Sequence, residues 1–160
     1  MVLYISLTVV ILALTRALAY WGIYFLKGNE ITLINGVLNL TYVENTGAAF
    51  GIFKNSTSML SFIGIALFVV ITYIAASKKD LGTYTKILMA CLAGGGLSNV
   101  CDRLSFGYVV DYINFCFINY PVFNLADICV VLSCILLAVK ICFDGNDDKN
   151  ENNNADGANG

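Results

Sequence analysis

Residues 123–143 read FNLADICVVLSCILLAVKICF, and this stretch decides the fold class. Between Asp127 and Lys140 it contains no charged residue. An apolar run of about 20 residues can cross the hydrocarbon core of a membrane as a helix. A carboxylate at the start of such an apolar run is costly to remove from water. Asp127 is therefore expected to have either a partner or a chemical task.

The composition of the whole chain agrees with a membrane protein. Of its 160 residues, 58% are hydrophobic and 12% are charged, about half the charged fraction of a typical soluble domain. Residues 1–143 carry eight Lys or Arg and six Asp or Glu, whereas residues 144–160 carry one Lys and five acids. No basic patch indicates a nucleic acid partner. The polar tail, 144–160, is predicted to be disordered and cytoplasmic.

Apolar runs predict a membrane all-α fold with four transmembrane helices, in the single domain 1–143. The spans are expected at about 2–26, 59–77, 84–101 and 122–143. Lysines crowd the link between the second and third spans, which places that link and both termini in the cytoplasm. Segments 27–58 and 102–121 then face outward. The ALA at 17–19 imitates a signal-peptide cleavage site, but no base precedes the apolar run, so a retained helix is expected.

The outer segments are predicted to form a small extracytoplasmic β-sheet. In EITLINGVLNLTYV (30–43), two β-prone runs flank Asn35-Gly36, a strong hairpin signal. GYVVDYINF (107–115) also reads as a strand. An edge of this sheet could receive an extended peptide.

Several kinds of chemistry are disfavoured by the residue types. The chain has no histidine, which removes the usual general base and the usual zinc ligand. Its six cysteines form no CxxC pair, and four lie in apolar spans, where they are expected to be small buried hydrophobes. Only Cys101 and Cys116 lie near water, which leaves a bond between them open. Neither a metal nor a cofactor is expected.

Two acids, Asp111 and Asp127, are the candidate catalytic residues. Taken alone, Asp127 could be a helix-capping residue with Asn124, and Asp111 could be a solvated strand residue. Both, however, lie on the outer side, and Asp127 follows Asp111 by 16 positions, which lets the chain turn back. Two carboxylates in a poorly solvated site share one proton. The charged member can then activate water while the protonated member polarises a carbonyl, as in aspartic proteases.

Two further stretches carry polar residues beside the spans. In GGGLSNVCDR (94–103), the glycines allow close helix approach, and Asn99 and Arg103 share a helical face. Arg103 could instead snorkel or pair with Asp102. ENTGAAFG (44–51) by itself reads as a turn.

Four motifs in this order resemble the lipoprotein signal peptidase family, also called signal peptidase II, a family of bacterial aspartic proteases. The matching stretches are NTGAAF (45–50), GGGLSNVCDR (94–103), VVDY (109–112) and FNLAD (123–127). The resemblance implies four membrane helices with an outward-facing β-cradle in the bacterial inner membrane. It also implies removal of the signal peptide of a prolipoprotein, just before its diacylglyceryl-modified cysteine.

The resemblance also implies roles for individual residues. The family's catalytic dyad corresponds to Asp111 and Asp127, and the family's substrate-binding and dyad-supporting positions correspond to Asn45, Gly47, Asn99, Arg103, Asn124 and Ala126. Lipid-modified prolipoproteins, membrane lipid and the cyclic peptide antibiotic globomycin are the partners that it implies.

One departure from the family pattern concerns the first span. Members commonly carry an acid and an amide before a Thr-Lys pair, whereas LALTR has Leu12 and Ala13 there and Arg16 in place of lysine. We therefore expect Arg16 to lack its usual partner.

Two other functions remain open from the sequence. A Ser-Lys protease could use Ser56 or Ser58 with Lys54. A transporter or proton relay could use the buried acids without hydrolysis.

Overall fold

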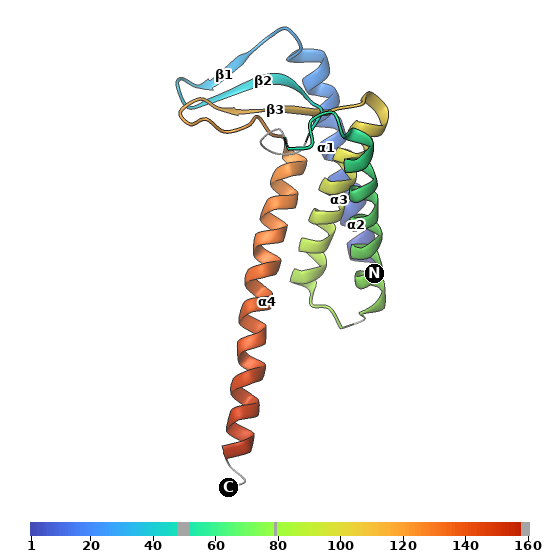
Figure 1. The fold of residues 1–160 in the computed structure, drawn as a ribbon, viewed down its shortest axis with the longest axis vertical. Coiled ribbons are helices and arrows are strands. Elements are labelled where there is room, and N and C mark those ends of the chain that lie inside the picture. The colour runs from blue at the N-terminus through green and yellow to red at the C-terminus, as the bar shows by residue number, and fades with distance from the viewer. Residues whose placement is uncertain (48–51, 79, 158–160) are drawn as a thin grey trace.

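The computed structural model describes residues 1–47, 52–78 and 80–157, with side chains described up to residue 143. Four helices lie side by side beneath a small sheet, which covers one end of them (Figure 1). The helices are α1 Val2–Phe25, α2 Thr57–Ser77, α3 Thr83–Phe106 and α4 Leu125–Gly157. The strands are β1 Ile31–Ile34, β2 Leu38–Asn45 and β3 Val109–Phe115. The predicted helices and the predicted small sheet are thus both present.

Three helical segments are long and apolar enough to cross a membrane: Val2–Phe25, Thr57–Ser77 and Leu125–Phe143. Their large apolar side chains, such as Val10, Phe62 and Ile135, are exposed, as expected of surfaces that face lipid. The chain is accordingly a membrane protein, and three of the four predicted spans have suitable helices.

Helix α3 occupies the predicted third span but is not among these three segments. It packs against α1, α2 and α4, and its buried residues include the polar Ser98 and Asp102. A helix covered by protein on several sides does not need apolar side chains all around it. Its mean hydropathy is therefore a weaker indicator of a span, and the fourth span stays a prediction.

Glycines bring α3 close to its neighbours, as the sequence predicts. A Cβ on Gly94 would lie 3.0 Å from the Thr8 carbonyl oxygen of α1. A Cβ on Gly95 would lie only 2.6 Å from the Ala126 carbonyl oxygen of α4. These contacts hold the start of α4 directly against α3.

The three strands form one antiparallel sheet in the order β1-β2-β3. The Asn35-Gly36 hairpin prediction is confirmed: Gly36 has a φ of 70°, and the Val37 N–H bonds to the Ile34 carbonyl at 3.0 Å. β3 pairs with β2 so that Asn45 lies opposite Val109, and Val43 lies opposite Asp111. This register brings the end of β2 to the first candidate aspartate.

Helix α4 continues to Gly157, through a segment for which the sequence predicts disorder. Its last turns project away from the other helices (Figure 1). Asn and Gly, which are frequent in that part of the helix, have low helix propensity. The side chains of 144–157 lie outside the described ones, so disorder of the tail stays a prediction.

Cys101 and Cys116 are both free thiols, so the disulfide left open by the sequence is absent. Cys91 and Cys129 are half-buried in their helices, but Cys134 and Cys142 are exposed on α4. The expectation of burial inside protein is therefore wrong for Cys134 and Cys142, whose helix surface is free to face lipid.

Candidate active site

Asp111 lies in β3 and is buried, with 1% of its surface exposed. Its Oδ2 accepts a hydrogen bond from Asn45 Nδ2 at 2.9 Å, and its Oδ1 accepts one from Asn124 Nδ2 at 2.7 Å. The interpretation of Asp111 as a solvated strand residue is therefore wrong.

Asp127 lies in the first turn of α4 and forms a reciprocal cap with Asn124. The Asp127 N–H donates to Asn124 Oδ1 at 3.0 Å, and the Asn124 N–H donates to Asp127 Oδ2 at 3.1 Å. This is the geometry of a capping box, so the capping interpretation is confirmed. Asp127 Oδ1 also accepts a bond from Asn99 Nδ2 at 2.7 Å. An oxygen of Asp127 is thus held by a side chain of another helix, which capping does not require.

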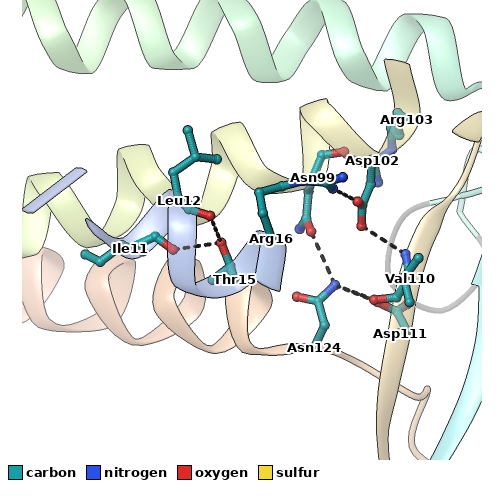
Figure 2. Close-up of polar contacts among 10 residues, drawn as sticks. All are labelled: Ile11, Leu12, Thr15, Arg16, Asn99, Asp102, Arg103, Val110, Asp111 and Asn124. Atoms are coloured by element: carbon teal, nitrogen blue, oxygen red, sulfur yellow. Dashed lines mark hydrogen bonds and ion pairs between the residues drawn. The ribbon is translucent and has the colours of Figure 1, made fainter. Parts of the chain in front are cut away.

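Asn124 connects the two acids. Its Nδ2 donates to Asp111 and, at 3.2 Å, to Asn99 Oδ1, while its backbone N–H binds Asp127. Figure 2 shows its amide between Asn99 of α3 and Asp111 of β3. Both acids line one cavity of about 150 Å³. Other residues around this cavity are Asn45, Gly47, Asn99, Arg103, Tyr120 and Phe123.

The pKa of Asp111 is raised from 3.8 to about 7. Burial is the main cause, and the negative charge of Asp127 adds to it, while the hydrogen bonds from Asn45 and Asn124 and the charge of Arg103 act in the opposite direction. A carboxyl with this pKa holds its proton for a large part of the time near neutral pH. The site can therefore present one protonated acid, as a shared-proton pair requires.

Arg103 contacts the segment that follows β2. Its Nη2 donates to the Gly47 carbonyl at 3.0 Å, and its Nη1 donates to the Asn99 carbonyl at 3.4 Å. Gly47 in turn donates its N–H to Asn45 Oδ1 at 3.0 Å. Arg103 is thus neither a snorkelling residue nor the partner of Asp102. The remaining residues of the NTGAAF motif, 48–50, lie outside the described residues.

Leu12 stands where the family has its acid, so Arg16 lacks that usual partner, but it is paired with an acid of α3 instead. Its Nη1 forms an ion pair with Asp102 Oδ1, shown in the close-up of Figure 2. Its guanidinium also lies 5.0 Å from the ring centre of Tyr20 and 5.5 Å from that of Phe106. Asp102 Oδ2 accepts the Val110 N–H at 3.1 Å. Because Val110 precedes Asp111, the pair anchors β3 beside the first acid.

Two other predicted features have clear positions. Ala126 is 2% exposed, and its backbone carbonyl packs against Gly95. Lys54 is exposed, and within the described ranges no hydrogen bond joins it to Ser56 or Ser58. The residues of the Ser-Lys alternative therefore show no catalytic arrangement.

Sequence reasoning missed Tyr112 as a supporting residue. Its hydroxyl accepts the Leu125 N–H at 3.1 Å, which satisfies a free donor at the start of α4. Successive side chains of a strand point to opposite faces, so Tyr112 and Val110 lie on the face of β3 opposite Asp111. This alternation was the signal in the sequence that could have indicated a supporting role for Tyr112.

Comparisons with known proteins indicate the family to which the chain belongs. The family described as "Signal peptidase (SPase) II" matches residues 7–143. A lipoprotein signal peptidase from Clostridium novyi (strain NT) is 34% identical over 136 residues, which cover 82% of this chain and 92% of that protein. One from Moorella thermoacetica (strain ATCC 39073 / JCM 9320) is 36% identical over 137 residues, which cover 84% and 89%.

A solved structure described as a bacterial membrane enzyme, determined by the in meso method at 2.3 Å resolution, is also similar. It has a TM-score of 0.82 and 26% identity, and the match covers 90% of each chain. The chain therefore belongs to the signal peptidase II family.

Proposed function

We propose that this protein is an aspartic endopeptidase that removes the signal peptide of prolipoproteins, N-terminal to the diacylglyceryl-modified cysteine. The family supports prolipoprotein processing. The observation that carries the aspartic mechanism is the convergence of Asp111 and Asp127 on one cavity, with Asn124 bonded to both.

In this mechanism Asp111 begins as the protonated acid and Asp127 as the carboxylate. Asp127 takes a proton from a water molecule, whose oxygen adds to the scissile carbonyl carbon, while Asp111 gives its proton to the carbonyl oxygen. The resulting tetrahedral intermediate returns that proton to Asp111 as the carbonyl reforms. The C–N bond breaks, and Asp127 passes its proton to the leaving amine. Each acid ends in its starting state, and no cofactor or metal is required.

The surrounding residues have positioning roles in this proposal. Asn45, Asn99 and Asn124 hold the carboxylate oxygens through the bonds described above. Arg103 fixes Gly47 beside the cavity, where their polar groups can contact a substrate backbone. Ala126 allows α4 to approach α3 closely.

We further propose that domain 1–143 crosses the bacterial cytoplasmic (inner) membrane four times, with α3 as the fourth span. Lys78, the C-cap of α2, lies at the end of the helices away from the sheet, which supports cytoplasmic termini and tail and an outward-facing active site. The peptide would extend along the sheet while the substrate's acyl chains stay in membrane lipid. Globomycin would compete for the dyad.

The test uses purified protein and a lipid-modified prolipoprotein, with products separated on a gel and the new N-terminus determined by mass spectrometry. Cleavage before the modified cysteine by the wild type, and none by Asp111→Asn or Asp127→Asn, is the expected result. Ser56→Ala, Ser58→Ala and Lys54→Ala serve as controls and should cleave normally. Equal product from all variants would reject the dyad, and loss in a Ser or Lys variant alone would favour the serine mechanism. Normal processing by both Asp variants, together with loss of transport, would favour the transporter.

A further inference from the structure

Val110 of β3 lies immediately before Asp111, and both of its backbone polar groups bond to side chains outside β3. Its N–H donates to Asp102 Oδ2 of α3 at 3.1 Å. Its carbonyl accepts a bond from Asn124 Nδ2 at 3.4 Å. Val110 and Asp102 are buried, with 0% and 2% of their surface exposed. A buried backbone N–H costs free energy unless it has a partner, so Asp102 supplies a bond that β3 needs at this position.

Arg16 holds the Asp102 carboxylate by its other oxygen. Arg16 Nη1 is paired with Oδ1, which leaves Oδ2 to accept the Val110 N–H. Figure 2 shows the Asp102 side chain between Arg16 and Val110. The guanidinium in turn lies 5.0 Å from the ring centre of Tyr20 and 5.5 Å from that of Phe106. Because both of its oxygens are engaged, the carboxylate is fixed in orientation, and α1 and α3 together hold the backbone of β3.

Arg16, Asp102 and Val110 are not among the described residues that line the catalytic cavity, whereas Asp111 is. An effect of Asp102 on the reaction must therefore pass through the backbone of β3. A catalytic group has to be held within about 0.5 Å of its productive position by the residues around it. The bond between Asp102 and Val110 can do this for Asp111, because it acts on the adjacent residue of the chain.

We propose that Asp102 is a positioning residue of the peptidase, which sets the position of Asp111 through the hydrogen bond from the Val110 N–H. This role rests on the proposed function, because it concerns the same pair of aspartates. It requires an oxygen that accepts the Val110 N–H, whereas the negative charge of Asp102 serves the ion pair with Arg16. An asparagine side chain keeps such an oxygen without the charge, and a leucine side chain of similar size has neither. The two roles can therefore be separated by substitution.

The experiment compares two double variants, Asp102→Asn/Arg16→Met and Asp102→Leu/Arg16→Met. Both lack the two charges of the ion pair, so neither leaves a buried charge without a counter-ion. They differ in whether residue 102 can accept the Val110 N–H. Without that acceptor the N–H loses a bond in a buried place, and we expect β3 to move toward another acceptor. A movement of about 0.5 Å corresponds to about tenfold in rate, since a misplacement of about 1 Å costs about 100-fold.

The measurement is kcat and KM for cleavage of a lipid-modified prolipoprotein by the purified full chain, at a temperature below the denaturation midpoint of each protein. We expect kcat to be about tenfold lower in Asp102→Leu/Arg16→Met than in Asp102→Asn/Arg16→Met. KM should differ by less than about twofold, because residue 102 does not line the cavity that would hold the substrate. A merely structural role for Asp102 would change the denaturation midpoints but not the kcat of the folded proteins.

A change in the backbone provides a second test if Asp102→Leu/Arg16→Met does not fold. Replacement of Val110 by its α-hydroxy acid turns the peptide N–H into an ester oxygen and leaves every side chain unchanged. In the otherwise unaltered chain this change should also lower kcat about tenfold, with little effect on KM. A kcat equal to that of the wild type would overturn the proposal.

Equal kcat values for the two double variants, or a difference carried by KM, would also overturn the proposal. Failure of the proposed function gives a different result, which is equal cleavage by the wild type and by Asp111→Asn. The positioning role of Asp102 is therefore tested after the need for Asp111 has been measured.

Discussion

Replacement of Gly95 by alanine should disable the dyad without touching either aspartate. The new Cβ would lie 2.6 Å from the Ala126 carbonyl oxygen and 3.1 Å from Cys129 Cβ. The Ala126 oxygen belongs to the backbone, so no side-chain rotation relieves the contact. Because ordinary contact begins at 3.4 Å, the start of α4 must move about 0.8 Å from α3. Asp127 is the next residue along the chain and moves with it.

The magnitude follows from this displacement. A misplacement of about 1 Å in a catalytic group costs about 100-fold in rate, so Gly95→Ala should lower kcat/KM by about that factor. Overpacking of a buried site typically costs about 1–3 kcal/mol of stability. The bond from Asn99 Nδ2 to Asp127 Oδ1, now 2.7 Å, should lengthen. The assay is the rate of prolipoprotein cleavage at several substrate concentrations, with a thermal denaturation midpoint for each protein.

Gly96→Ala is the matched control. Among the described residues, no atom outside the adjacent turns of α3 lies within 4 Å of the position that its Cβ would take. Alanine also favours a helix over glycine by about 1 kcal/mol. We expect wild-type cleavage and equal or higher stability. A folded Gly95→Ala protein that cleaves at the wild-type rate would refute the claim that the close α3–α4 contact positions Asp127.

Three further predictions concern other parts of the site. Burial and the charge of Asp127 raise the pKa of Asp111 to about 7, so its proton is present below that pH and is lost above it. The value of kcat/KM should therefore fall about tenfold per pH unit on the alkaline side. A flat profile of kcat/KM from pH 6 to 9 would contradict this prediction. Arg103→Lys should lower kcat/KM at least about tenfold, because lysine cannot bond in a fork to the Gly47 and Asn99 carbonyls; unchanged kinetics would refute this role. Asp102→Asn should lower the free energy of unfolding by about 3–5 kcal/mol, because it removes the counter-ion of Arg16. The double variant Asp102→Asn/Arg16→Met should have a higher thermal denaturation midpoint than Asp102→Asn alone. Equal midpoints for these two variants would contradict the pairing.

The sequence predicted those features that depend on local patterns. The Asn35-Gly36 hairpin and the Asn124–Asp127 cap are each set by a few neighbouring residues, and both are present. The two candidate acids were found because few other ionisable residues lie beside the spans. Their convergence on one cavity agrees with the topology deduced from the apolar runs.

Features that depend on distant residues were not predicted. The Arg16–Asp102 pair joins α1 to α3 across 86 positions, and the departure from the family pattern drew attention only to the missing local partner. The contact between Tyr112 and Leu125 requires knowledge of how β3 lies against α4. The mean hydropathy of α3 likewise does not reveal that α1, α2 and α4 all pack against this helix.

The central claim is that Asp111 and Asp127 hold one proton between them. Infrared difference spectra of protein labelled with ¹³C at the aspartate carboxyl carbons count protonated aspartates directly as pH is raised. We predict one protonated carboxyl that titrates near pH 7 in the wild type and is absent from Asp111→Asn. In Asp127→Asn its midpoint should fall, because a neighbouring negative charge is removed, but remain above 3.8 because Asp111 is still buried. Absence of a protonated aspartate from the wild type at pH 6 would contradict the account. The same titration midpoint in the wild type and in Asp127→Asn would also contradict it.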